Sequence, residues 1–190
     1  PVIGLLVSYG VMVSLIWAVH KISIHNINRI FGKLQIFSSG VMALSHGHND
    51  AQKSMGIIAL ALVTYYPAKE FSVPLWVILS CAIAMGLGTL MGGWRIIRTL
   101  GVKMIKLQPI NGFAAETTAA GVIMGASFFG MPISTTQVIS SSILGVGVAK
   151  RSSAVKWGVV GNILVAWVFT IPATFLLSGS IAFIYKNYFY

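Results

Sequence analysis

Asp50 is the residue whose surroundings most clearly indicate chemistry. It lies in the polar run Ser45–Lys53, between the largely apolar run Leu34–Leu44 and the apolar run Gly56–Val63. A charge at the centre of a bilayer costs about 2.5–3.5 kcal/mol on insertion scales, so such charges are rare and usually face a bundle interior or a pathway. The pattern therefore predicts a binding site at membrane depth.

The helix around Asp50 is expected to break. Gly47 can release the helix, and Asn49 or Asp50 can cap a new half-helix that starts near Ala51. Oxygens of Asn49 and Asp50 would then bind a hard cation, while the free amides of the half-helix favour an anion. Lys53 would either face that anion or hold Asp50 in place. The alternative is that Asp50 is only an N-cap, with Lys53 as its salt-bridge partner.

A second carboxylate, Glu116, lies among the small residues of the run Ala114–Ala120. Small side chains let helix backbones approach closely and leave room for an ion. Glu116 is therefore a candidate cation ligand. The alternative is that Glu116 extends to the membrane interface beside Lys103 and Lys106.

Three consecutive hydroxyl side chains, Ser134, Thr135 and Thr136, follow Pro132 and precede an apolar helix. Ser and Thr at a helix start are ordinary N-caps. Within a membrane, however, hydroxyls and free amides at a half-helix start form a cup of donors that suits a tetrahedral oxyanion.

The composition is that of a membrane protein. Hydrophobic residues make up 56%, charged residues 8%, and the mean hydropathy is +0.86, all outside the averages for soluble domains. The net charge of +10 comes from Lys and Arg that lie mostly between apolar runs, so nucleic-acid binding is not expected. The absence of a Ser-His-acid spacing, a nucleotide loop or a zinc pattern predicts neither an enzyme nor a cofactor.

The apolar runs predict an all-α fold, a polytopic membrane helix bundle with broken or re-entrant hairpins, and a single transmembrane domain over residues 1–190. Four runs are long enough to cross a hydrocarbon core of about 30 Å. The run 107–149 is too long for one span, and its polar residues and prolines predict two short spans or a re-entrant hairpin joined to helices. The four single spans are residues 2–19, 34–66, 74–94 and 157–177.

The connectors predict the sidedness of the bundle. By the positive-inside rule, the basic connectors face the cytoplasm. The connector in which the opposite charges of Lys69 and Glu70 cancel faces outside. The connector His20–Lys33 is compatible with a helix on the membrane surface or with a solvated basic loop. Because the chain starts at Pro1 with neither an initiator Met nor a basic leader region, we expect it to be a fragment or a processed segment rather than a full open reading frame.

Topology unites the three polar clusters, because half-helices that meet near the midplane are the architecture of secondary transporters. The alternatives are an anion channel, in which the clusters line a pore, and a membrane scaffold that transports nothing, in which they hold helices together.

The chain also resembles a known family, the PiT inorganic phosphate transporters, which are cation-coupled phosphate symporters. The resemblance covers roughly residues 34–177. It implies two inverted repeats with re-entrant hairpins, of which this chain is similar to the C-terminal repeat. The motifs that carry it are Gly47, Asn49–Lys53 and Met55–Gly56, followed by Gly112–Glu116 and Pro132–Thr136.

The resemblance implies roles for these residues. Asn49 and Asp50 correspond to cation-site and phosphate-site residues, and Glu116 to an essential membrane carboxylate. The run 134–136 corresponds to the phosphate cup, in which Ser134, Thr135 and Thr136 are the hydrogen-bond donors. Ser134 is also a candidate cation ligand. His48 and Gln137 depart from the family, which commonly has a small residue and a His there; with Lys53 they are candidates for gating or for supporting the site.

The resemblance also implies partners. These are inorganic phosphate, a coupling ion, the lipid bilayer and the N-terminal repeat of the same transporter, in a multi-pass protein of the cell membrane. The coupling ion is Na⁺ or H⁺, and Asp50 and Glu116 would bind it if it is Na⁺. Whether the protein forms a homodimer stays open.

Overall fold

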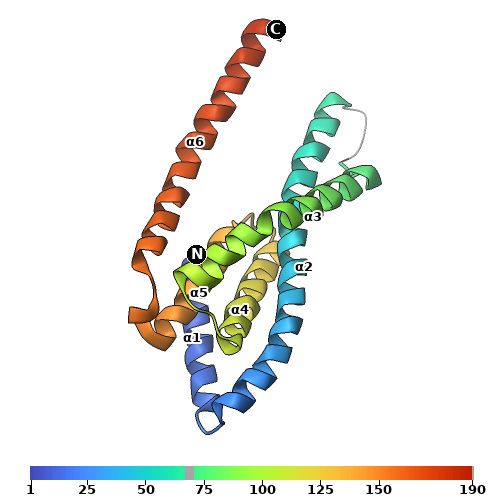
Figure 1. The fold of residues 1–190 in the computed structure, drawn as a ribbon. Helices are drawn as coiled ribbons and strands as arrows, with labels where there is room; N and C mark the ends of the chain where they lie inside the picture. The colour runs from blue at the N-terminus through green and yellow to red at the C-terminus, as the bar shows by residue number, and fades with distance from the viewer. Residues whose placement is uncertain (67–70, 190) are drawn as a thin grey trace. The chain divides into compact units, whose positions relative to one another are not determined.

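The computed structural model describes residues 1–66 and 71–189, and in these ranges the chain is helical and has no strand (Figure 1). The chain divides into two compact units, Pro1–Val155 and Lys156–Tyr190. The expectation of an all-α fold is confirmed. The prediction that residues 1–190 form a single transmembrane domain stays a prediction.

The first unit starts with two helices joined by a short connection. α1 spans Val2–Val19, the same bounds as the first apolar run, and α2 spans Ile24–Tyr65. Residues 24–33, for which a surface helix or a loop was the expectation, are therefore the first turns of α2. At 1.5 Å per residue the 42 residues of α2 extend about 63 Å, twice the thickness of a hydrocarbon core.

The predicted break in the helix at Gly47 is wrong, because α2 runs without interruption through Gly47 and Asp50. Neither Asn49 nor Asp50 caps a half-helix. A glycine inside a helix costs only about 1 kcal/mol relative to alanine, too little to outweigh the packing of a long helix. The Asn49 side chain instead donates to Ser127, and Asp50 accepts from Thr135 on another helix as well as from Lys53 on α2.

The run 107–149 forms a helical hairpin of α4, Pro109–Phe128, and α5, Thr135–Arg151. Pro109 occupies the first turn of α4, where its missing N–H is not needed. Gly130 ends α4 with φ 66°, and the amides of Gly130 and Met131 donate to the carbonyls of Ser127 and Ala126. This is a Schellman motif, which needs a residue that tolerates positive φ.

The first unit also contains one more long helix and two short helical turns. α3 spans Leu75–Arg98 and packs on α2, followed by a π-helical turn, η1, at Thr99–Met104 and, after α5, a 3-10 turn, η2, at Ser152–Ala154. α5 packs on α1 and α4, and α4 packs on α2 (Figure 1). A buried cluster joins α2, α4 and α5 and consists of Met42, Ala119, Ala120, Ile123 and Val138.

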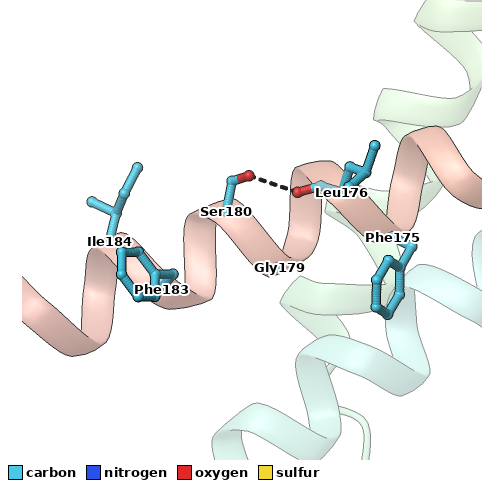
Figure 2. Close-up of a pocket in the computed structure, with 6 residues that line it drawn as sticks. All are labelled: Phe175, Leu176, Gly179, Ser180, Phe183 and Ile184. Atoms are coloured by element: carbon cyan, nitrogen blue, oxygen red, sulfur yellow. Dashed lines mark hydrogen bonds between the residues drawn. The ribbon is translucent and has the colours of Figure 1, made fainter.

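The second unit is one helix, α6, which spans Trp157–Phe189 and continues beyond the predicted end at residue 177. Figure 2 shows a shallow hollow along α6 between Phe175 and Ile184. The only polar side chain that lines it, Ser180, donates to the carbonyl of Leu176 at 2.7 Å, so the hollow offers an ion no free side-chain group.

Three helices among the described residues are long and apolar enough to cross a membrane, by length and composition. They are Val2–Val19, Leu75–Trp94 and Trp157–Asn187. The run 34–66 is not one of them, because its polar cluster lowers the hydropathy of α2. Lys69 and Glu70 lie outside the described residues, and the predicted sidedness of the connectors stays a prediction.

Candidate functional site

The site is built on the parallel pairing of α2 with α4. The Ser38 hydroxyl donates to Glu116 Oε2 at 2.6 Å, and the Asn49 side-chain amide donates to Ser127 Oγ at 2.7 Å. Both bonds join residues that are 78 positions apart. The two helices are therefore parallel with a constant offset, so a residue of α2 lies beside the residue of α4 that is 78 positions later in the sequence.

Asp50 on α2 is hydrogen-bonded to the start of α5. Its carboxylate accepts hydrogen bonds from Lys53 Nζ at 2.9 Å and from the Thr135 hydroxyl at 3.0 and 3.2 Å. Lys53 Nζ also donates to the carbonyl of Ile133 at 2.5 Å. Of the two sequence alternatives for Lys53, the structure has the one in which it holds Asp50. The alternative in which Asp50 is only an N-cap is wrong, since α2 does not begin there.

His46 lies one turn before Asp50 on the same face of α2. Its Nδ1 is 3.7 Å from Asp50 Oδ2, is buried and has no hydrogen-bond partner among the described residues. His48, the other histidine in this run, is exposed and pairs with Gln52 through its Nε2 at 2.9 Å. Of the two, His46 is the one that lines the cavity described below.

The three hydroxyl residues at the start of α5 have three different environments. Ser134 is the N-cap and accepts from the backbone amide of Gln137 at 3.4 Å. Thr135 is buried and donates to Asp50. Thr136 is exposed and lines the cavity. The predicted helix start is therefore present, with one of its hydroxyls already bonded to a carboxylate.

Glu116 has a separate set of partners on α2. Besides Ser38, the Gln35 side chain hydrogen-bonds Glu116. Gly112, one turn before Glu116, makes room for Gln35, because a Cβ at position 112 would overlap its amide group. Glu116 has no ion-pair partner in the part of the chain that the structure describes.

Asn49 is enclosed between α2 and α4. It is buried, with 4% of its surface exposed, and its Oδ1 accepts no hydrogen bond from any described residue. Its Nδ2 is bonded to Ser127. Asn49 therefore joins two helices and is not a lining residue of the cavity.

One cavity of about 580 Å³ connects the two carboxylates within the first unit. Asp50, His46 and Thr136 line one part of it, and Glu116 and Gly112 line another. Its walls come from α2, α3, η1, α4 and α5, and most of the other lining residues are apolar or glycine. They include Met42, Gly88, Gly92, Ile96, Leu100, Ala119, Ile139 and Ile143.

The structure separates the two predicted cation ligands along this cavity. Glu116 lies at the level of Ser38, and Asp50 is twelve positions further along α2, about 18 Å at 1.5 Å per residue. Asp50, Lys53 and Thr135 come together, but Glu116 does not join them. No group of three or more His, Cys, Asp or Glu that could hold a metal occurs in residues 1–66 and 71–189.

Several contact residues were missed by the sequence interpretation: Gln35, Ser38 and Ser127. Helical spacing was the signal for the first two. Positions 35, 38, 42, 46 and 50 recur every three or four residues, which puts them on one face of a helix. Recognising that face up to Asp50 required a helix that continues through Gly47, where the sequence interpretation predicted a break.

Comparison with known proteins identifies similar chains. The sequence profile of the phosphate transporter family matches residues 2–178. A Rhizobium meliloti protein named "Probable low-affinity inorganic phosphate transporter" is 46% identical over 180 residues, which cover 94% of this chain and 54% of that protein. A Bacillus subtilis protein of the same name is 43% identical over 189 residues, covering 98% of this chain and 56% of that protein.

One solved structure, named "The sodium-dependent phosphate transporter", has the same fold, with a TM-score of 0.77 and 25% sequence identity. The match covers 98% of this chain and 54% of that one. This chain thus spans about half the length of the proteins that it matches here. All three are named as transporters, which agrees with the prediction that the chain is not an enzyme.

Proposed function

Because the chain belongs to the phosphate transporter family, we propose that it forms part of a membrane transporter that moves inorganic phosphate together with Na⁺ or H⁺. The names of its relatives support phosphate as the substrate, and the name of the similar solved structure supports Na⁺. The cavity that connects Asp50, Thr136 and Glu116 carries the proposal, since one space contains hydrogen-bond donors for an anion and a carboxylate, Glu116, that has no ion-pair partner among the described residues.

Phosphate binds, in this proposal, beside the N-terminus of α5. The first amides of a helix are unpaired and carry a partial positive charge, which favours an anion. Thr136 adds a hydroxyl that lines the cavity, and Ser134 and Thr135 hold the helix start in place from the cap and from Asp50. Asn49 holds α4 against α2 behind this end of the site.

Electrostatics explains why a cation would be transported together with phosphate. Moving one negative charge against a negative-inside potential costs about 2.3 kcal/mol per 100 mV, and phosphate carries one or two such charges at neutral pH. Cations that travel with phosphate cancel this cost. Asp50 and Glu116 are the carboxylates along the cavity that can hold them.

The rest of the binding site comes, in this proposal, from the N-terminal repeat of the same transporter. The relatives are about twice the length that this chain matches, which supports a second repeat. Alternating access by rocking of two repeats about a central site is the general mechanism of such folds. We place the transporter in the cell membrane as a multi-pass protein.

Phosphate uptake into proteoliposomes that contain the full-length protein tests this function. Uptake should be driven by an imposed Na⁺ gradient or an imposed H⁺ gradient, and it should saturate with phosphate. Flux that ignores both gradients would favour the anion channel, and no flux in well-inserted protein would favour the scaffold.

The substitution Asp50→Asn sharpens this test. It should abolish uptake and leave membrane insertion intact, because the loss of the charge removes the ion pair with Lys53 and one of the two carboxylates proposed to hold the cation. Asp50→Asn protein with normal uptake would contradict the role of Asp50. Insertion is measured separately by the yield of monodisperse protein from the membrane fraction.

A further inference from the structure

Basic side chains gather at one end of the first unit. The offset between α2 and α4 puts Lys33 beside Asn111, in the first turn of α4, and Arg29 lies one turn earlier on α2. The rings of Phe31 and Phe113 pack edge to face in the same region, with centroids 5.4 Å apart. The start of α2 and the start of α4 therefore lie side by side at this end.

The end of α5 and the η1 turn bring further basic residues to the same place. Lys150 Nζ donates to the side-chain oxygen of Gln108, the N-cap of α4. The amide of Leu107 donates to the carbonyl of Gly101 at 3.3 Å, which holds η1 against the segment before α4. This set of six exposed side chains, the basic end, consists of Arg29, Lys33, Lys103, Lys106, Lys150 and Arg151.

The basic end has no acidic counterpart within the described residues. The sequence has three acidic residues, of which Glu70 lies outside the described ranges. Asp50 is ion-paired with Lys53, and Glu116 accepts a hydrogen bond from Ser38. In residues 1–66 and 71–189, no member of the basic end forms an ion pair. Like charges that are close together repel, so an anion from outside the chain would stabilise this end.

An apolar surface borders the basic end. Ile36 and Phe37, three and four residues after Lys33 on α2, are 75% and 72% exposed. Trp17, in the last turn of α1, is 77% exposed. Exposed apolar and aromatic residues beside Lys and Arg are typical of a helix end at the boundary between hydrocarbon and headgroups. A nucleic acid or an acidic protein matches the charge alone, whereas an anionic phospholipid matches both the charge and the apolar border.

We propose that the basic end binds the headgroup of an anionic phospholipid, whose acyl chains lie along the apolar border. Clusters of four to eight Lys and Arg at the end of a membrane helix are a general signature of such binding. Lys106, before α4, and Lys150, on α5, contact the lipid phosphate and so join the two ends of the α4–α5 hairpin that lie away from its turn. This inference goes beyond the proposed function, because it concerns a lipid and does not depend on transport.

The test is a lipid titration of the full-length protein in an uncharged detergent. Phosphatidylglycerol should raise the melting temperature to a plateau, and phosphatidylcholine with the same acyl chains should not. The combined variant Arg29→Gln/Lys106→Gln/Lys150→Gln should need about 100-fold more phosphatidylglycerol for the half-maximal rise. This follows from about fivefold for each charge removed, the equivalent of about 1 kcal/mol per basic residue near an anionic surface.

Matched variants separate charge from packing. The combined variant Arg29→Lys/Lys106→Arg/Lys150→Arg keeps all three charges and should respond to phosphatidylglycerol as the wild type does. Lys186→Gln removes an exposed charge from α6, outside the basic end, and should also leave the response unchanged. If the neutral combined variant does not fold, the single variant Lys106→Gln takes its place, with an expected change of about fivefold.

The outcomes decide between a lipid and a free anion. Equal phosphatidylglycerol requirements of the wild type and the neutral variant would overturn the inference, as would a charge-keeping variant that behaves like the neutral one. Inorganic phosphate should act on the melting temperature of the wild type and of the neutral variant alike. A phosphate response that is lost in the neutral variant would show that the basic end binds free phosphate and would overturn the lipid. Because no outcome is read from phosphate uptake, failure here leaves the proposed function untouched.

Discussion

Replacing Thr135 with valine tests whether Asp50 holds the start of α5. Thr135 is buried, with 2% of its surface exposed, and its hydroxyl is 3.0 and 3.2 Å from the two carboxylate oxygens of Asp50. Valine keeps the size and the branched shape of threonine but donates nothing. The substitution therefore removes one hydrogen bond to a charged group from the junction of α2 and α5.

The expected magnitude follows from the environment of the bond. A hydrogen bond to a charged group contributes about 1.5–3 kcal/mol to stability. Asp50 keeps Lys53 as a partner and its side chain is 25% exposed, so interactions with Lys53 and water compensate for part of the lost hydrogen-bond energy. We expect Thr135→Val to lower the free energy of unfolding by about 1.5 kcal/mol, the lower end of that range.

A double-mutant cycle with Asp50→Asn measures the interaction itself. Unfolding free energies of the wild type, both single variants and the double variant in the same detergent give the coupling energy between the two side chains. Thr64→Val is the control, because Thr64 is exposed on the same helix as Asp50 and donates to the Leu60 carbonyl. A coupling energy below about 0.3–0.5 kcal/mol, the level found for independent sites, would refute the reasoning.

Two further predictions follow from the same contacts. Lys53→Met removes the ion-pair partner of Asp50 and the hydrogen bond to the Ile133 carbonyl. Because Lys53 is 37% exposed, we expect the free energy of unfolding, measured by thermal unfolding, to fall by only about 1–2 kcal/mol. The control Lys33→Met, at an exposed position, should leave it unchanged. Gly112→Ala should displace the Gln35 amide from Glu116 and lower the proposed phosphate uptake. Its unfolding free energy should stay within about 1 kcal/mol of wild type, because the gain in helix propensity offsets the crowding. Unchanged melting of Lys53→Met, or unchanged uptake by Gly112→Ala, would contradict these contacts.

The pairing of Asp50 with Lys53 changes how the polar cluster of α2 is understood. The sequence interpretation assigned Lys53 either to an anion or to Asp50, and the structure has Lys53 bonded both to Asp50 and to the turn before α5. Asp50 is thus a structural anchor of the hairpin as well as a candidate site residue. In the proposed function, phosphate at this end of the cavity would meet hydrogen-bond donors that Asp50 holds in position.

Local patterns were sufficient to predict several elements. The apolar run at residues 2–19 coincides with α1, because a helix of that length and hydropathy needs no information from the rest of the chain. The start of α5 was predictable from Pro132 and Ser134, since a helix cannot readily continue through proline and serine is a favoured N-cap. The three motifs shared with a known family were sufficient to indicate the family, because each motif is a short run of neighbouring residues.

The break predicted at Gly47 shows where local patterns fail. A glycine and two possible caps suggested a half-helix, but the backbone responds to the sum of packing along α2, which one glycine does not outweigh. Asn49 and Asp50 therefore project from a continuous helix toward α4 and α5. Their hydrogen-bond partners, Ser127 and Thr135, are far away in sequence and could not be chosen from spacing within the run.

The sequence by itself determined the membrane character, the family and the chemical types of the candidate residues, because hydropathy, charge and short motifs are properties of neighbouring residues. Only the tertiary structure decided which of those residues meet. The register between α2 and α4 places Glu116 with Ser38 and leaves it about 18 Å from Asp50 along α2. That register depends on the packing of two whole helices, and no local pattern contains it.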